Sequence, residues 1–177
     1  MALHTLLIGQ NSQLFLWRTK PDGTRQVSWR LWLLTFLLPV LFSMGALVLA
    51  FDSVSYIQRS ELTSATVSNV YAWESWTPWQ GDTTTYGPVL DYVTLDGQAR
   101  SASNGMSSTR WNFPIGSQQE IYYLPDLNGD VRLANFERLW AVPVTIGVIA
   151  LVLWLPALIV MAVLLRWLRG AVPLTET

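Results

Sequence analysis

The sequence of 177 residues contains no cysteine, one histidine (His4) and one lysine (Lys20). The absence of cysteine excludes disulfides and thiolate metal ligands. It also means that cysteine usage gives no information about whether the protein lies in an oxidising or a reducing compartment. Because His4 and Lys20 both lie before residue 30, the long central segment cannot form a Ser–His–acid, Cys–His or Ser–Lys arrangement. We therefore predict that the protein is not an enzyme, and that it has no catalytic, cofactor-binding or metal-binding residues.

Charged residues are also scarce, because they make up 13% of the chain, against about a quarter in an average soluble domain. The formal net charge of -1 gives no basic footprint for nucleic acid. Hydrophobic residues make up 51% of the chain. This composition favours a membrane protein with no nucleic-acid partner.

Two long apolar runs account for that composition. The longer one lies between Arg138 and Arg166, with no charge in between, and as a helix it would reach about 40 Å, more than the roughly 30 Å hydrocarbon core of a bilayer. Residues 31–51 form a second uncharged run of suitable length. We predict two transmembrane helices, at 31–51 and 139–165, with the lipid bilayer as their partner.

The charges flanking the two runs predict an orientation. The two ends of the chain are net positive, whereas residues 52–138 carry ten acidic residues and five arginines. Basic residues close to the ends of membrane spans mark the cytoplasmic side. Residues 1–30 and the tail 166–177 should therefore be cytoplasmic and residues 52–138 extracytoplasmic. In the N-terminal segment, Lys20-Pro-Asp-Gly23 is typical of a tight turn, so we expect either a short hairpin or an interfacial segment there.

The central segment shows the period of β-strands. In residues 65–74, Ala65, Val67, Asn69, Tyr71 and Trp73 alternate with a second set, as in a strand with two faces. Asp96-Gly97 follows another such run and favours a hairpin. The fold class predicted is membrane α + β: two transmembrane helices flank a small antiparallel β-domain of four or five strands, which could be a partly open barrel. The strands are expected at 65–74, 83–95, 98–103, 118–124 and 131–136.

Several short motifs of this domain resemble a bacterial two-span membrane family catalogued as a domain of unknown function (DUF3592). The motifs are Tyr-Gly-Pro-Val at 86–89, Tyr-Val-Thr-Leu-Asp-Gly at 92–97, Phe-Pro-Ile-Gly-Ser at 113–117, Ile-Tyr-Tyr-Leu-Pro-Asp at 121–126 and Arg-Leu-Ala-Asn-Phe at 132–136. The resemblance covers about residues 31–165. It implies a helix, β-domain, helix layout in a bacterial envelope protein of the cytoplasmic (inner) membrane, and it supplies no activity or site residues.

Acidic residues are the remaining candidates for metal binding or catalysis. Asp126-Leu-Asn-Gly-Asp130 resembles the start of a calcium loop, but its glycine is misplaced for an EF-hand. A plain turn of Asn, Gly and Asp is the favoured interpretation. Nothing in the spacing selects a carboxylate pair among the ten acidic residues, so a hydrolase is the least favoured class.

The most unusual feature is a tryptophan cluster at Trp73, Trp76 and Trp79. These side chains could anchor the domain at the membrane interface, cap the end of the β-core, or form an exposed surface that recognises a protein or a glycan. Trp111 and Phe113 are expected on a second loop at the same rim. The five aromatic residues are the candidate partner-binding residues.

Three classes of function follow from this sequence. The first is a non-enzymatic membrane protein whose β-domain binds a protein partner, including an immunity protein against a toxin that acts on the membrane or in the periplasm. The second is an accessory subunit held in a larger complex through its helices. The third is the carboxylate hydrolase. Gly45 and Gly147 favour packing of the two helices within one chain, and homo-oligomers remain an alternative.

Overall fold

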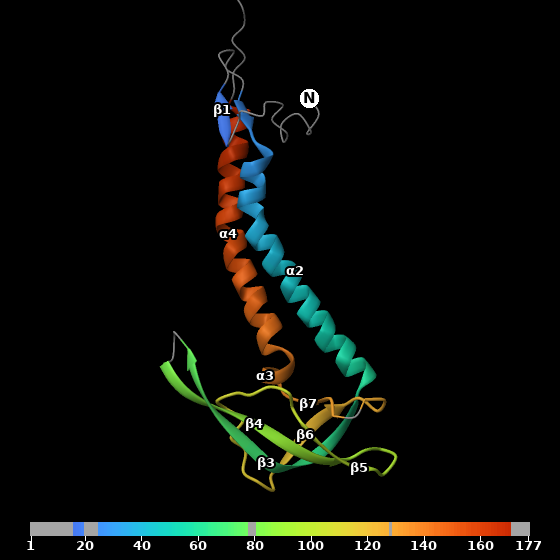
Figure 1. Cartoon of the computed structure of the whole chain (residues 1–177). Helices are drawn as coiled ribbons and strands as arrows, with labels where there is room; N and C mark the ends of the chain where they lie inside the picture. Colours follow the sequence, from blue (N-terminus) through green and yellow to red (C-terminus); the bar gives the residue numbers. More distant parts are fainter. Residues whose placement is uncertain (1–15, 20–24, 78–80, 128, 171–177) are drawn as a thin grey trace, which may run out of the picture. The chain divides into compact units, whose positions relative to one another are not determined.

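The computed structural model describes residues 16–19, 25–77, 81–127 and 129–170 (Figure 1). The chain divides into two compact units, one made of residues 1–48 with 143–177 and the other of residues 49–142. Two long apolar helices flank a five-stranded antiparallel sheet, which confirms the predicted α + β class. The sheet is open and does not close into a barrel.

The two helices are α2 (Trp29–Arg59) and α4 (Ala141–Arg169), and both are long and apolar enough to cross a membrane. Only 6% of the most apolar stretch of α2 and 11% of that of α4 is buried, whereas the core helix of a soluble protein is mostly buried. Helix α2 extends beyond its predicted span at both ends, whereas α4 begins two residues later than predicted and extends past residue 165. Helix α2 continues past residue 51, because the polar residues after Phe51 remain helical up to Arg59.

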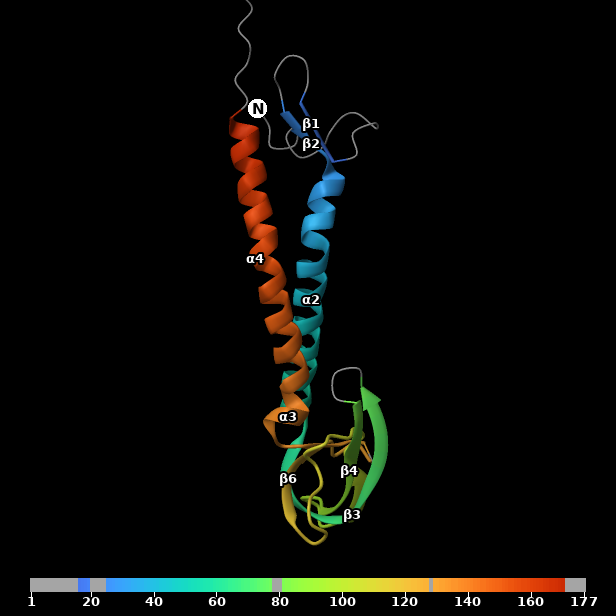
Figure 2. The same cartoon turned by 90° about the vertical axis from the view of Figure 1, so that its left-hand side faces the viewer.

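Within the first unit, α2 and α4 lie side by side in both views (Figures 1 and 2). Ser43 joins them, because its hydroxyl donates to Pro39 O at 2.7 Å and accepts from Trp154 Nε1 at 3.0 Å. The glycines permit the close approach expected from the sequence: a Cβ on Gly45 would lie 3.9 Å from Ile146 Cγ2. Polar bonds and small residues are the usual means of helix packing in lipid.

The same unit contains the short N-terminal hairpin, β1 (Trp17–Thr19) and β2 (Arg25–Val27). The hairpin alternative is thereby confirmed, while the turn residues 20–23 lie outside the described residues. Arg25 donates to the backbone oxygen of Trp167 in the last turn of α4, and its guanidinium lies 5.1 Å from the Trp167 ring centroid. A cation at this position stabilises the carbonyl end of the helix dipole.

The second unit contains the sheet, whose strand order is β5-β4-β3-β6-β7 with every neighbouring pair antiparallel. The Asp96-Gly97 hairpin is confirmed between β4 and β5, and Gly97 has the positive φ of +82° that such turns require. The five strands are β3 (Glu61–Thr77), β4 (Gly81–Val93), β5 (Ala99–Ser103), β6 (Gln118–Tyr123) and β7 (Val131–Leu133).

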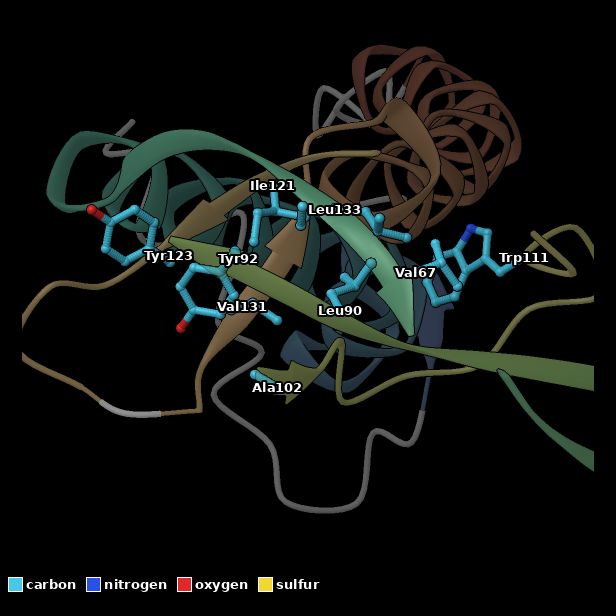
Figure 3. Close-up of a cluster of buried hydrophobic side chains, with 10 residues drawn as sticks. Val67, Leu90, Tyr92, Ala102, Trp111, Ile121, Tyr123, Val131 and Leu133 are labelled. Atoms are coloured by element: carbon cyan, nitrogen blue, oxygen red, sulfur yellow. The ribbon is translucent and has the colours of Figure 1, made fainter. Parts of the chain in front are cut away.

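One face of the sheet carries the core (Figure 3). Val67, Leu90 and Ile121 come from three adjacent strands and are fully buried, and the rings of Tyr92 and Tyr123 lie 5.4 Å apart at one end of the cluster. A bulge between Val67 and Asn69 then breaks the register of β3 with β4. The extra residue reverses the alternation, so Tyr71 and Trp73 lie on the face opposite Ala65 and Val67, and the single face predicted for these residues is wrong.

The last two turns of α2 are tied to this sheet by buried polar contacts. The hydroxyl of Tyr56 donates to the backbone oxygens of Asp130 at 3.1 Å and Tyr122 at 3.3 Å. Ser53 donates to the backbone oxygen of Leu139 at 2.6 Å, in the short helix α3 (Phe136–Leu139). The Arg132 guanidinium lies 3.9 Å above the Tyr56 ring centroid. The end of α2 is therefore packed against the sheet through these contacts, and no flexible linker separates the two elements.

Candidate functional site

The structure places the five candidate residues in three different settings. Trp73 and Trp76 are exposed, at 50% and 68% of their surface, so the interpretation that they cap the β-core is wrong for these two. Trp79 lies outside the described residues. Trp111 and Phe113 belong to the core and its edge.

Trp111 is 2% exposed and joins the core cluster, with Phe113 partly buried against it. The prediction of an exposed second loop is therefore wrong for Trp111. The reason is local: the backbone of Ser108 exchanges hydrogen bonds with Tyr86, and Trp111 N–H then donates to Ser108 O at 3.4 Å. This turn brings the Trp111 ring next to Val67 at one end of the core cluster (Figure 3). The exposed large apolar side chains of this loop are instead Met106, at 44%, and Ile115, at 71%.

Trp73 and Trp76 stand on what we call the ribbon, residues 70–77 of β3 paired with residues 81–88 of β4. The ribbon runs on beyond the rest of the sheet (Figure 1), because β6 ends its pairing with β3 at Thr66. Residues three apart on a strand point to opposite sides. Trp73 and Trp76 therefore cannot form one continuous surface, and the ribbon presents an aromatic side chain on each of its two faces.

The outer face of the ribbon carries Tyr71 and Trp73, with ring centroids 6.1 Å apart. The Trp73 ring lies against Gly87, where a Cβ would come within 2.6 Å of Trp73 Cζ3. Glycine at this position therefore allows the ring to lie flat on the neighbouring strand. Beside the ring is a shallow hollow of about 340 Å³, lined by Trp73, Ser103, Gly105, Met106 and Ser107.

The inner face of the ribbon carries Trp76 together with two acidic side chains, Glu74 on the same strand and Asp82 directly opposite Trp76. No described residue of the ribbon is basic. The two faces thus differ in chemistry: the outer one is aromatic and uncharged, and the inner one is aromatic and acidic.

Sequence reasoning missed two members of this surface. Tyr71 could have been found, because it lies two residues before Trp73 and therefore on the same face. Met106 could not have been found from the sequence, because the long connection after β5 brings it next to Trp73. No local pattern in residues 104–110 indicates that contact.

Several carboxylates of this unit serve as hydrogen-bond acceptors. Glu61 accepts from the hydroxyl of Tyr123, and Glu137 accepts from Ser108. Burial raises the pKa of the Tyr123 hydroxyl, and its bond to Glu61 raises it further. The Thr94 hydroxyl, which donates to Asp96, lowers the pKa of that carboxyl. Among the described residues, no three His, Cys, Asp or Glu side chains come together as a metal site would need.

Comparisons with protein-family models, with curated proteins and with solved structures found no match to this chain. The resemblance to DUF3592 therefore stays a prediction, and the ribbon has to be interpreted from its own geometry.

Proposed function

We propose that the protein is held in the bacterial cytoplasmic membrane by α2 and α4, and that its sheet domain binds a protein partner on the extracytoplasmic side without catalysing a reaction. The low burial of both helices supports insertion into lipid. The excess of acidic residues in 52–138, against basic residues near both helix ends, supports the orientation.

The observation that carries the binding role is the exposure of Tyr71, Trp73 and Trp76 on a ribbon that projects from a sheet with a complete core of its own. The core therefore does not require these rings. Large aromatic side chains left uncovered are characteristic of protein interfaces, where they bury much area at a small cost in side-chain entropy.

A membrane-interface anchor is the second candidate, because tryptophans on both faces of a ribbon also suit the headgroup layer. Two features weigh against it. Glu74 and Asp82 share the inner face with Trp76, and the ribbon has no described basic residue to meet lipid phosphates. A protein partner with basic groups would cover the exposed rings and also pair with the carboxylates of Glu74 and Asp82.

A photo-crosslinking amino acid placed at Trp73 in intact cells tests the choice. We expect a discrete protein adduct from position 73 and none from position 95, where Leu95 is even more exposed, in the β4–β5 turn. Adducts to lipid alone would favour the anchor, and an absence of adducts from position 73 would contradict both roles.

The absence of cysteine makes the orientation testable with single-cysteine variants. A membrane-impermeant maleimide should label Ser101→Cys in intact cells, because Ser101 is exposed on β5. Arg169→Cys should be labelled only after lysis. The reverse pattern would place the sheet domain in the cytoplasm.

A further inference from the structure

The side of β3 that faces away from β4 loses its partner halfway along the strand. Pairing with β6 covers Glu61–Thr66, and one more step follows at Val67, whose N–H donates to Ser117 O at 2.9 Å and whose oxygen accepts from Gly116 N–H at 2.8 Å. From Ser68 onward, no described residue pairs with this side of the strand. We call the segment Val70–Trp76, on this side, the open edge.

The hydrogen-bond pattern identifies which backbone groups face the open edge. Tyr86, directly opposite Ala72, exchanges its bonds with Ser108 at 2.9 and 3.0 Å rather than with β3. Since successive residues of an antiparallel strand point their backbone groups alternately to either side, Ala72, Glu74 and Trp76 direct N–H and C=O groups outward. Only Val70 N–H is locally satisfied, by Asn69 Oδ1 at 2.8 Å.

The open edge has only part of the usual protection of sheet edges, because a bulge precedes it at Val67–Asn69 and Glu74 is charged, but the strand is long. Natural proteins protect such edges with lysine, proline or very short strands. The segment Val70–Trp76 contains neither lysine nor proline, and Glu74 is its one charge. The outer strands of the sheet are short by comparison, with five residues in β5 and three in β7.

We propose that the open edge binds an extended segment of another protein by strand addition, and that this segment carries basic side chains on the side of Glu74. The proposal rests on the proposed function and specifies how the partner is held. Unpaired N–H and C=O groups at strand spacing are complementary to one class of ligand, the backbone of an extended peptide.

Charge favours a partner of opposite sign over a second copy of the chain. Glu74 and Asp82 lie on the inner face of the ribbon, and residues 52–138 contain ten acidic residues, five arginines and no lysine. Pairing two open edges would bring two copies of Glu74 close together, and like charges across strands are destabilising. A lysine or arginine opposite Glu74 removes that penalty.

The alternation of a strand then defines the rest of the ligand. Its residues opposite Tyr71 and Trp73 lie on the outer face and should be apolar, to cover the two rings. Its residues opposite Glu74 and Trp76 lie on the inner face and should be basic, for the carboxylate and for a cation–π contact with the indole.

A heptapeptide of alternating lysine and valine is a suitable probe, titrated by fluorescence anisotropy onto the full-length protein in lipid nanodiscs. We expect saturable binding that weakens at least about tenfold when alternate backbone nitrogens of the peptide are methylated, because two or more hydrogen bonds are lost. Equal binding of the methylated peptide would overturn strand addition, since its side chains are unchanged. An absence of binding by the unmethylated peptide would overturn the proposal outright.

Variants of the protein give the complementary test. Ala72→Pro removes an outward N–H and should weaken the peptide about tenfold, whereas Ala72→Val keeps that N–H and should bind as the parent does. Near-ultraviolet circular dichroism checks that the proline variant is folded, and the methylated peptide gives the same answer on unchanged protein.

The outcomes separate this inference from the proposed function. Loss of the adduct from position 73 in Trp76→Ala, with no effect of Ala72→Pro on that adduct, would leave protein binding in place and overturn strand addition. Self-association of the protein that is lost in Ala72→Pro would identify a second copy as the occupant and contradict the basic segment. Lipid adducts from a photo-crosslinking amino acid at position 76, without peptide binding, would assign the ribbon to the membrane interface.

Discussion

The two halves of strand β3 share one backbone and one neighbour, β4, but differ in what covers them. The first half, up to Val67, has β6 at its side and the core beneath it, with Ala65 and Val67 almost fully buried. The second half, from Val70, has an open edge and exposed rings on both faces. Stability is therefore concentrated in the first half, and the second half is left available for contacts with other molecules.

The largest expected effect lies in the covered half. Leu90, opposite Val67 and fully buried, should cost about 3 kcal/mol of unfolding free energy when replaced by alanine, from lost burial and the cavity left behind. Urea titration of the full-length protein in detergent micelles measures it. Val93→Ala, at an exposed position of the same strand, is the matched control and should cost far less. Equal costs would remove the contrast between buried and exposed positions.

The next largest loss of stability is expected when the hydrogen bonds between Tyr56 of α2 and the sheet domain are removed. Tyr56→Phe removes the donor to the Tyr122 and Asp130 carbonyls and should cost about 1–2 kcal/mol near neutral pH, measured by the same urea titration. A cost near zero would show that the hydroxyl does not hold the helix to the sheet.

The same residue gives a prediction about pH. Burial, and then the nearby Asp130, raise the pKa of the Tyr56 hydroxyl above its ordinary value of about 10. The folded chain therefore keeps a proton that the unfolded chain loses. The stability linked to this group is complete below about pH 10 and declines as pH rises through the folded pKa. Tyr56→Phe should flatten the alkaline decline in part, since burial also raises the pKa of Tyr123.

A smaller effect is expected where the ribbon begins. Gly87→Ala places a Cβ within 2.6 Å of the Trp73 ring, and that ring must turn away at a cost of about 1 kcal/mol. The near-ultraviolet circular dichroism of the aromatic pair Tyr71–Trp73 should change with it. In a Trp73→Ala background, Gly87→Ala should be nearly neutral, and a persistent cost there would mean that the backbone, not the ring, excludes the methyl group.

The smallest effect on stability is expected at Trp76. Its side chain is 68% exposed, so Trp76→Ala should change the unfolding free energy by no more than about 0.5 kcal/mol. Its effect on the crosslinked partner should be large by contrast. A substantial loss of stability would show that Trp76 has a structural role and would weaken its assignment to a binding surface.

Much of the architecture follows from local pattern. Unbroken apolar runs predicted both long helices, and alternation with an Asp-Gly turn predicted the strands and the β4–β5 hairpin. These signals are local because helix and strand periods depend on neighbouring residues only. The order of the strands needed the structure, because β6 pairs with the first half of β3 across a long separation in sequence.

The candidate site was less accessible to sequence reasoning, for two physical reasons. The bulge after Val67 shifts the alternation by one residue, so a strict period of two assigns Tyr71 and Trp73 to the wrong face. Trp111 lies in a polar, turn-rich stretch typical of an exposed loop, yet the Ser108–Tyr86 bridge turns its ring into the core. Both depend on pairing between distant residues.

The contact between Arg25 and Trp167 joins residues 142 positions apart in the sequence. It can form only after the second long helix has been synthesised almost to its end. During synthesis the N-terminal hairpin must therefore wait, its guanidinium without this acceptor, while the whole sheet domain is produced and placed. The Arg25–Trp167 contact forms at the end of assembly, and its presence distinguishes a chain in which α2 and α4 are both packed from one in which only α2 has formed.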